Sequence, residues 1–570
     1  MTTPTAPPPT GPPAGEEPDP RRWIALAVVL TAAFMQLVDI SIVNVAIPSI
    51  QRDLDASYAQ IQWVLAGYQL AFAVTLITGG RLGDIFGRKR LFVLGMTGFT
   101  LASALCGLAQ SPAMLIGSRV FQGLMGAIMF PQTLSVIQVT FPPRERATAF
   151  GTFGATIGLA TITGPLVGGL LINGDLLGLE WRPIFLVNVP IGIVALAGAL
   201  RLLRESRAPH ALRTDPLGVA IVSAGLLLLV YPLVEGRDLG WPAWTFVSMA
   251  AALPVLALFA LWERRKRAAD GSPLVELDLF RQRAFVAGLL VAGFFFMGIP
   301  AFFLIFTLWL QVGLGFTALH AGLTGIPFAV GSALASAASV RLAPRLGRRI
   351  LSLGALLITV GMAGLIATID RYGGGTHSWQ LIPALAVCGL GLGSVVAPLV
   401  NVVLAGIRRQ DAGAASGVLT TVQQLGGAVG VAVIGVLFFG LLGSHAGAVT
   451  TELAPGLRGQ LSAAGVPAPV EQQVLTGFGA CFQDRSHAKD PFAVPPSCQR
   501  AQAQAGSQPR IGRVVASAAD TARRRNFSEV LERTLWFEVA VFLFCCLLIL
   551  LLPSVRGRAL EQAAEPAAVT

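Results

Sequence analysis

Two charged side chains lie inside long apolar runs of this sequence, where a charge is difficult to hold. Asp39 lies about two-thirds along the run 23–47, and Arg119 is the only Lys or Arg that lies away from the ends of such a run. A charge at the centre of a membrane-spanning helix costs about 2.5–3.5 kcal/mol on insertion scales, so it usually faces a polar pathway and serves a function. The pair predicts a proton-coupling site, with Asp39 as the carrier and Arg119 as its charged partner.

Each residue also has a simpler interpretation. Asp39 could be a packing or helix-end residue that its neighbours satisfy, and Arg119 could extend its head group to water from an outer helix end. Glu538 is a rival carboxylate, and we expect it near the outer end of the last apolar run.

The composition indicates a membrane protein with many spanning helices. Of the 570 residues, 54% are hydrophobic and 12% charged, against about 25% charged in soluble proteins. Apolar runs of about 20 residues, long enough to cross about 30 Å of hydrocarbon, recur along the chain. We expect an all-α fold with about fourteen transmembrane helices. They are placed at 23–47, 60–80, 91–109, 114–139, 147–172, 183–202, 216–235, 244–262, 284–310, 320–342, 350–369, 381–407, 413–442 and 534–553.

Basic residues orient these helices. Most of the 41 Lys and Arg residues fall in short loops on one side if both termini are cytoplasmic, as the positive-inside rule requires. We therefore expect a multi-pass protein of the cell (inner) membrane. The tails 1–22 and 554–570 are predicted to be cytoplasmic, and the first is predicted to be disordered.

The segment 443–533 is the only long polar stretch between predicted spans. The helix count makes it extracytoplasmic, and it contains Cys481 and Cys498. Two loop cysteines on an oxidising face could form a disulfide. The alternative is a pair of free, unrelated thiols.

A short basic turn occurs twice. Gly79–Leu91 reads GGRLGDIFGRKRL, and Ser339–Leu351 reads SVRLAPRLGRRIL. The second span would then correspond to the tenth. This predicts a six-helix bundle at 23–202, two inserted helices within 203–283, and a second bundle formed by 284–442 and 534–553. Repeats that meet around a midplane site are typical of secondary transporters.

The first of these turns and three other segments resemble the major facilitator superfamily, specifically its fourteen-helix drug:proton antiporter family. The other segments are Leu37–Pro48, Leu115–Ala127 and Gly154–Gly169, and Ser41 replaces the usual Thr in the first of them. Trp181–Gly192 and Gly413–Gly430 are weaker matches. The resemblance covers about residues 23–442 and the last span.

The resemblance assigns roles to further residues. It implies a conformational latch formed by Gly80, Gly83, Asp84, Gly87 and Arg88. It also implies an antiporter motif in the fifth span, formed by Gly154, Gly158, Gly164, Pro165, Gly168 and Gly169. From the residues alone, these could be a basic turn that only sets topology and a Gly-rich packing face.

An aromatic, weakly polar cavity would suit amphipathic and often cationic compounds. Its candidate lining residues are Phe34, Tyr68, Phe72, Gln122 and Gln423, although packing or lipid contact could explain each aromatic residue. We expect a proton-driven exporter of small hydrophobic or cationic drugs and antibiotics. A solute importer or facilitator of the same superfamily, or a sensor without transport activity, is the alternative.

Several function classes are disfavoured. None of the three lysines follows a Gly, so a Walker A loop is missing, and the five histidines are scattered. We expect no enzyme activity, no cofactor, no metal and no nucleic-acid partner. The expected partners are a small-molecule substrate, protons and the lipid bilayer, around a monomer.

Overall fold

The computed structural model describes residues 20–175, 178–207, 213–404, 412–488, 494–506 and 509–552. All regular elements in these ranges are helical, which confirms the all-α prediction. The predicted tails fall almost entirely outside them, because 1–19 and 553–570 are not described.

The N-terminal half is a bundle in which the first and fourth helices meet at the centre. Its helices are α1 (Arg22–Asp53), α2 (Tyr58–Phe86), α3 (Arg88–Gly107), α4 (Pro112–Thr140), α5 (Pro143–Asn173), α6 (Pro183–Leu186) and α7 (Asn188–Leu202). Caps begin several of them. Ser57 and Gln60 form a capping box at α2, and Ser111 accepts from the amide of Met114 at α4. Helix α7 packs on α1 and α3, and α4 packs on α2 and α3.

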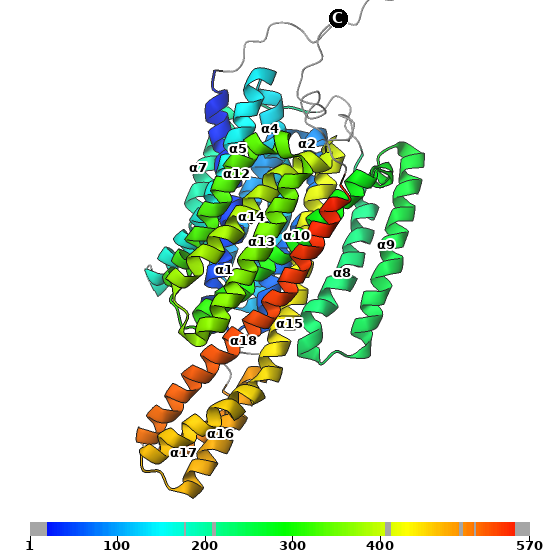
Figure 1. The fold of residues 1–570 in the computed structure, drawn as a ribbon. Coiled ribbons are helices and arrows are strands. Elements are labelled where there is room, and N and C mark those ends of the chain that lie inside the picture. The colour runs from blue at the N-terminus through cyan, green and yellow to red at the C-terminus, as the bar shows by residue number, and fades with distance from the viewer. Residues whose placement is uncertain are drawn as a thin grey trace, which may run out of the picture.

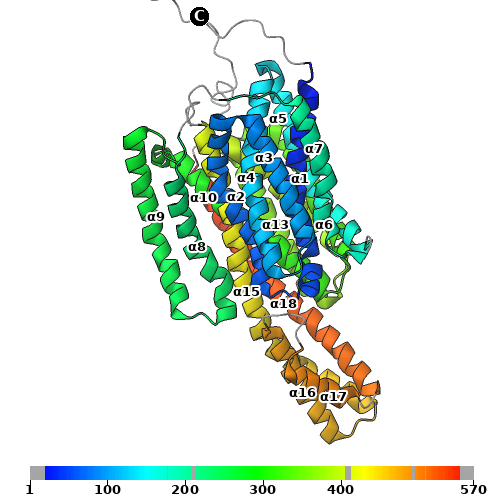
Figure 2. The same cartoon turned by 180° about the vertical axis from the view of Figure 1, so that it is seen from behind.

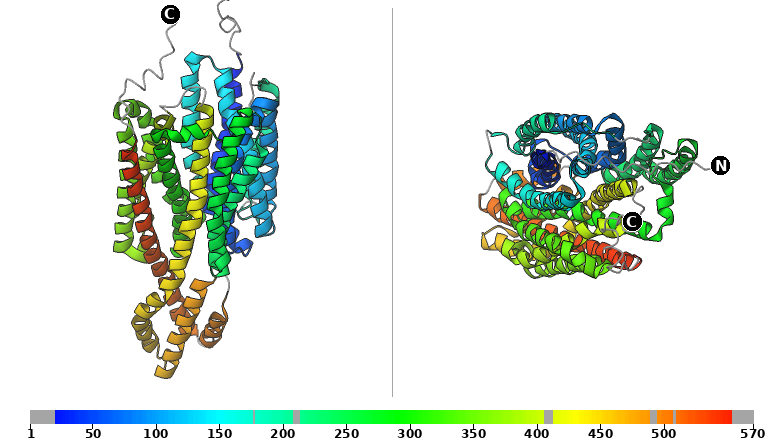
Figure 3. Two further views of the ribbon diagram at one scale, coloured as in Figure 1. Left: turned by 90° about the vertical axis from the view of Figure 1, so that its right-hand side faces the viewer. Right: turned by 90° about the horizontal axis from the view of Figure 1, so that it is seen from above.

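The C-terminal half repeats this packing. Its helices are α10 (Arg283–Leu308), η3 (Trp309–Gly313), α11 (Ala318–Thr324), α12 (Ile326–Leu346), α13 (Arg348–Tyr372), η4 (Gly373–Gly375), α14 (Ser378–Leu404), α15 (Ala412–Ala463) and α18 (Pro509–Leu550). Helix α18 packs on α10 and α13, and α14 packs on α12 and α13. Viewed along the bundle axis, the two halves lie side by side (Figure 3).

Two helices stand beside the bundle rather than in it. Helices α8 (Pro216–Leu239) and α9 (Ala243–Asp270) pack on each other, and α8 also contacts α2 and α15. Figures 1 and 2 show this pair at one edge, with the short helix η2 (Leu277–Arg281) leading from it to α10.

Twelve helices among the described residues are long and apolar enough to span a membrane, and the bent helix α2 makes thirteen. Helix α5 has 31 residues and packs along α1 in the same bundle. The prediction of about fourteen spans is therefore compatible with the structure, with α5 placed by its packing.

The predicted loop 443–533 is mostly helical. Helices α15 and α18 have 52 and 42 residues, far more than the about 20 that cross a bilayer. Both continue past the bundle and pack with α16 (Ala468–His487) and α17 (Pro496–Gly506). We call this part the extension, the bundle end beside it the loop end, and the opposite end, where α1 begins and α18 stops, the terminal end (Figures 1 and 3).

The extension has a small hydrophobic core of its own. Leu457 and Leu461 of α15 project at helical spacing toward Val474 and Phe478 of α16, and Ala522 of α18 closes the cluster. A disulfide joins Cys481 to Cys498, between α16 and α17. These contacts explain why a sequence that reads as polar continues as helix.

The bundle's two ends differ in how the halves meet. One hydrophobic cluster unites loop-end residues of α1 and α2, such as Ile47 and Ile61, with the C-terminal helices. The cluster at the terminal end of the N-terminal half, which includes Leu26, Phe92 and Phe141, contains N-terminal residues only. Among the described residues, the halves therefore share a core at the loop end and have separate cores at the terminal end.

Candidate proton-coupling site

Asp39 and Arg119 form an ion pair at the centre of the N-terminal half. Nη1 of Arg119 lies 2.5 Å from Oδ2 of Asp39, and the side chains are 1% and 0% exposed. Helix α1 supplies the carboxylate and α4 the guanidinium, so the pair links two helices. Opposite charges this close satisfy each other where water is excluded.

The second carboxylate oxygen accepts two further hydrogen bonds. Oδ1 of Asp39 lies 2.9 Å from Nδ2 of Asn188 and 3.0 Å from Nε2 of Gln122. Both oxygens thus face N–H donors, which suits an ionised carboxylate rather than a carboxylic acid.

Arg119 is held on the other side of the pair. Its Nε donates to the carbonyl of Val64 at 3.2 Å, and Nη1 also donates to Oε1 of Gln122 at 2.6 Å. The guanidinium lies 4.3 Å from the ring centroid of Tyr68, within cation–π range. Arg119 is therefore fixed inside the bundle and does not extend to a helix end.

Sequence reasoning missed two polar members of this network. Asn188 also donates to Oγ of Ser103 at 2.9 Å, and Ser103 donates to the carbonyl of Phe185 at 3.0 Å. The sequence contained a weak signal for both residues. Asn188 lies in the segment Trp181–Gly192 quoted above, and Ser103 is a polar residue within an apolar run.

The candidate cavity residues do not form one group. Tyr68 and Gln122 are buried beside Arg119, and Tyr68 stacks on Phe72 with 6.1 Å between ring centroids. Gln122 belongs to the charge network and is not a free lining residue. Phe34 and Gln423 are half-buried on α1 and α15, and no contact of either with the ion pair is shown.

Four buried glutamines on α1 and α2 have amide oxygens without a hydrogen-bond partner among the described residues. They are Gln36, Gln51, Gln62 and Gln69. Gln62 and Gln69 face Gly435 and Gly427 of α15 across the contact between the halves. Buried polar atoms without a partner are rare and call for an explanation.

The predicted latch lies at the terminal end, between α2 and α3. Asp84 accepts from Nη2 of Arg88 at 2.9 Å. Gly83 packs so closely on α4 that a Cβ there would overlap the amide of Gln132, whose Nε2 donates to the carbonyl of Gly79 at 2.8 Å. Gly80 faces the ring of Pro131 on the same helix.

Gly87 turns the chain between the two helices with φ +113°, a conformation that favours glycine. A Cβ at Gly87 would overlap the carboxylate of Glu205. Glu205 accepts from the amide of Lys89 at 3.1 Å and pairs with Arg90 at 3.7 Å. Sequence reasoning did not identify Glu205, which lies far along the chain.

The second basic turn occupies the matching place between α12 and α13, with Gly347 at φ +53°. Lys89 Nζ donates to the carbonyl of Leu200 at the end of α7 at 2.7 Å. Arg348 Nη1 donates to the carbonyl of Leu550 at the end of α18 at 3.0 Å. The two turns thus tie equivalent helix ends together.

The Gly-rich motif of α5 lies against both halves. Gly164 and Gly168 pack on Ser41 and Ile42 of α1, too closely for a Cβ. Gly169 packs on Leu319 of α11, and the carbonyl of Pro165 packs on Gly322 of the same helix α11. Gly154 and Gly158 belong to the same helix, but their surroundings lie outside what the structure describes.

The expected position of Glu538 was wrong. The residue does not lie near a helix end, because α18 begins at Pro509, well before the predicted start of the span. Glu538 is 0% exposed and lies inside the C-terminal half. The error arose because the polar first half of α18 masked the start of the helix.

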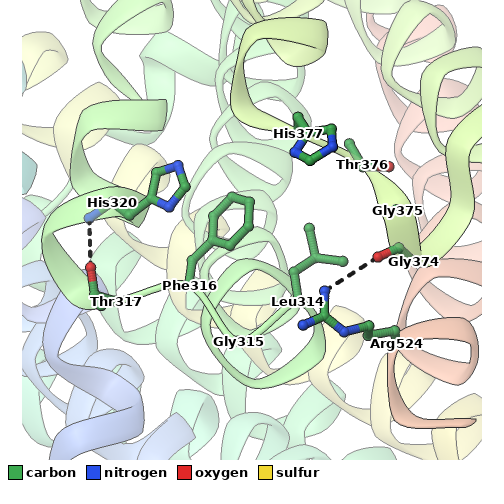
Figure 4. Close-up of a pocket in the computed structure, with 10 residues that line it drawn as sticks. All are labelled: Leu314, Gly315, Phe316, Thr317, His320, Gly374, Gly375, Thr376, His377 and Arg524. Carbon is green, nitrogen blue, oxygen red and sulfur yellow. Dashed lines mark hydrogen bonds between the residues drawn. The ribbon is translucent and has the colours of Figure 1, made fainter. Parts of the chain in front are cut away.

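One surface pocket lies at the loop end, remote from Asp39. Figure 4 shows its lining, which comes from three regions: Leu314, Gly315, Phe316, Thr317, His320, Gly374, Gly375, Thr376, His377 and Arg524. His320 stacks on Phe316 with 4.0 Å between ring centroids, and Arg524 donates to the carbonyl of Gly374 at 3.4 Å. Both histidines are exposed, so this pocket is separate from the buried charge site.

Comparisons with known proteins agree with the fold and the motifs. Residues 29–431 match the model of the Major Facilitator Superfamily. The chain is 45% identical over 539 residues to the "Probable actinorhodin transporter" of Streptomyces coelicolor, covering 94% of this chain and 92% of the relative. It is 35% identical over 432 residues to the "Tetracenomycin C resistance and export protein" of Streptomyces glaucescens, covering 74% and 77%.

A solved structure has the same fold. It is a bacterial homologue of the human lysosomal transporter Spinster in an inward-facing, unoccupied conformation, with a TM-score of 0.56 and 17% identity over 93% of this chain and 98% of that one. The extent of the family match and the 45% identity confirm the resemblance seen in the motifs. The chain belongs to the Major Facilitator Superfamily.

Proposed function

We propose that this protein exports small hydrophobic or cationic compounds, antibiotics among them, in exchange for protons. The names of the similar Streptomyces proteins, a transporter and an export protein, support the direction of transport. The observation that carries the proposal is the buried Asp39–Arg119 pair, since a paired charge inside a membrane bundle can be switched by one proton.

The terminal end faces the cytoplasm in this proposal, because most basic loop residues lie there. The halves share a core only at the loop end, so the structure corresponds to a state closed toward the outside. Tyr58 stacks on Phe439 at 3.8 Å, and Nε2 of Gln311 donates to the carbonyl of Val45 at 2.8 Å. Both contacts must separate when the outer side opens.

The state of Asp39 fits this position in the cycle. An ionised Asp39 is what remains after a proton has left toward the cytoplasm. When the outer side opens, a new proton would neutralise the carboxylate and end its ion pair with Arg119. The freed guanidinium would reorganise its contacts with Val64, Gln122 and Tyr68, which connects protonation to helix movement.

The substrate would lie between the halves, beside the unpaired glutamines of α1 and α2. A buried amide oxygen without a partner costs about 1–3 kcal/mol, so a substrate or water that donates to Gln36, Gln62 or Gln69 would be held there. Tyr68 and Phe72 add aromatic surface, which suits an apolar or cationic molecule.

The Gly80–Arg88 turn acts as the latch in this proposal. Closure of the terminal end would use the surface around Asp84 and Arg88, which lies at that end. The glycines of α5 touch both α1 and α11, so they can transmit a rearrangement at Asp39 to the other half.

Asp39→Asn tests the proposal, because it fixes the side chain in a neutral form. A panel of antibiotics and lipophilic cations, compared in cells with and without the protein, first identifies a transported probe. Efflux of that probe from proteoliposomes with an imposed pH gradient is then measured. The variant should insert and bind the probe, but should not accumulate it against the gradient.

Asp55→Asn is the matched control. Asp55 is exposed just after α1 and has φ +49°, which Asn tolerates well, so its efflux should equal that of the wild type. A full response of Asp39→Asn to the pH gradient would contradict the assignment of Asp39 as the coupling residue.

A further inference from the structure

Glu538 is the most isolated charged group that the structure describes inside the bundle. It is 0% exposed, and neither carboxylate oxygen has a hydrogen-bond partner among the described residues. It therefore forms no salt bridge with a charged group in the described part of the chain. A carboxylate that is buried and unpaired is far costlier than one held like Asp39.

The surroundings of Glu538 are apolar and small. Its Oε2 lies directly over Gly298 of α10, so that a Cβ there would approach it to 2.7 Å. Phe542, one turn along α18, fills the space beside it and packs edge-to-face on Phe295 of α10 at 5.6 Å. A glycine at position 298 leaves room for the carboxyl group to reach α10.

One weakly titratable neighbour is present. The thiol of Cys388 on α14 is near enough for the charge of Glu538 to act on it. It already contacts the carbonyl of Ile358 on α13 at 3.8 Å. Helices α10 and α15 form no salt bridge or hydrogen bond with Glu538 in their described parts.

The two halves put these groups in equivalent places. Helix α7 packs on α1 and α3, as α18 packs on α10 and α13. Asn188 points from α7, which ends at residue 202, to Asp39 of α1. Glu538 points from α18, which ends at residue 550, to Gly298 of α10. In the C-terminal half the carboxyl group therefore lies on the last helix, and no basic side chain pairs with it among the described residues.

We propose that Glu538 is a second proton-binding site, located in the C-terminal half, which holds its proton in the state described here. This inference rests on the proposed proton-driven export. In the cycle, Glu538–COOH dissociates to the carboxylate and a proton that passes to water, and the reverse step reloads it. Each half would then contain one carboxyl group that changes its charge.

The lack of any partner points to a role in the cycle rather than to packing alone. Even a protonated acid has an O–H group that needs an acceptor, and burying this donor without a hydrogen bond costs about 1–3 kcal/mol. A residue that only filled space would do so better as Leu or Met. The partner is therefore expected in another conformation, where α10 and α18 separate and water reaches Glu538.

Infrared spectroscopy of the full-length protein in lipid tests protonation without any substrate. Wild type and Glu532→Gln should show the carbonyl band of a protonated carboxylic acid, which disappears as the pH is raised. Glu532 lies on the same helix and is half-exposed, so it is the matched control. In Glu538→Gln the band should be lost, with about one proton fewer released per protein. A band unchanged in Glu538→Gln would overturn the proposal.

Labelling with dicyclohexylcarbodiimide gives a second readout that does not depend on the folding of a variant. This reagent adds to protonated carboxyl groups in apolar surroundings. Peptide mapping of wild-type protein should find the label on Glu538 and not on the ion-paired Asp39, and labelling should decline at high pH. Absence of label on Glu538 at every pH would count against the proposal.

Transport then separates this inference from the proposed function. In proteoliposomes, the probe found in the panel is driven by pH and voltage gradients to measure protons exchanged per molecule. Glu538→Gln should lower this ratio by about one, and Glu538→Asp should retain it. An unchanged ratio in Glu538→Gln would overturn the role of Glu538 and leave proton-driven export intact. If the wild type ignores both gradients, the proposed function fails, and the infrared result still decides whether Glu538 binds a proton.

Discussion

The two halves of the bundle share a packing plan and differ in their charges. In the N-terminal half, Asp39 is surrounded by Arg119, Gln122 and Asn188, so both of its carboxylate oxygens accept hydrogen bonds. In the C-terminal half, Glu538 has no partner at all among the described residues. The repeated fold therefore determines which helices pack together, whereas individual side chains determine whether a buried carboxyl group at that contact has partners.

The two basic turns show the same pattern. Both contain a glycine with positive φ, and both use the next basic residues to bind the end of the last helix in their half. Only the first has an acid four residues before its Arg, because Pro344 occupies the position that aligns with Asp84. The latch is therefore expected to be stronger in the N-terminal half.

Of these variants, Arg119→Ala should reduce proton-coupled efflux the most, because it removes the charged partner that distinguishes Asp39 from Glu538. Removing one partner of a buried pair typically costs about 3–5 kcal/mol, because the other charge is left uncompensated. Asp39 would then keep the amide donors of Gln122 and Asn188 but lose its charged partner, and proton-coupled efflux should be lost while membrane insertion persists. Efflux measured against pH in proteoliposomes checks this.

Arg119→Lys is the companion variant. A lysine keeps the charge but lacks the planar fork that contacts Asp39, Gln122 and Val64 together, so only part of the activity should return. Transport by Arg119→Ala with an unchanged pH profile would show that the pair is merely structural.

Gly83→Leu should abolish transport while expression and probe binding largely persist. The new side chain would push against Gln132 and separate α2 from α4. Gly117→Leu is the control, since a Cβ at Gly117 meets no atom within 4 Å. Asp84→Asn tests the same turn without changing its packing and should also stop turnover. Efflux at the wild-type rate in Asp84→Asn would refute a latch.

Asn188→Ala should have an intermediate effect. It removes one N–H donor from the Asp39 carboxylate and from Ser103, and a hydrogen bond to a charged group contributes about 1.5–3 kcal/mol. We expect proton-driven efflux to fall about tenfold, which corresponds to about 1.4 kcal/mol. Asn44→Ala is the control, because Asn44 bonds only the backbone of its own helix among the described contacts. Equal rates of proton-driven efflux in Asn188→Ala and Asn44→Ala would show that Asn188 has no role in proton coupling.

Much of the fold followed from local sequence signals. Apolar runs of membrane length and the repeated turn predicted the helices and the correspondence of their ends, since both depend on neighbouring residues. The charge of Asp39 and Arg119 inside such runs marked them as candidates. What local signals could not supply was their contact, which joins residues 80 positions apart.

The missed features share a physical reason. Asn188, Ser103 and Glu205 are ordinary polar residues whose role depends on which helix lies opposite. The extension was missed as helix because its Gly and Pro residues disfavour a helix and its polar residues lower its hydropathy, and its small core forms only when α15, α16 and α18 come together. Tertiary packing decides such cases, and one sequence contains no direct record of it.

Loss of the Cys481–Cys498 bridge should have the smallest effect on transport. The bridge spans 17 residues in the extension, and closing a loop of about this size stabilises a fold by about 3 kcal/mol. The double variant Cys481→Ser/Cys498→Ser should therefore make the extension easier to cut by proteases, while most efflux remains. The bundle's charge site lies in other helices, and the apolar core of the extension persists. Cys546→Ser, a half-buried thiol of α18 in the bundle, is the control for losing a cysteine elsewhere. Peptide mapping without reductant should recover the two cysteines joined, and finding both as free thiols would contradict the bridge.

The single variant Cys498→Ser also tests the orientation of the extension in the membrane, because it frees Cys481, which is half-exposed. An impermeant maleimide should label Cys481 of this variant in intact spheroplasts. Labelling only after the membrane is permeabilised would place the extension in the cytoplasm and reverse the proposed topology.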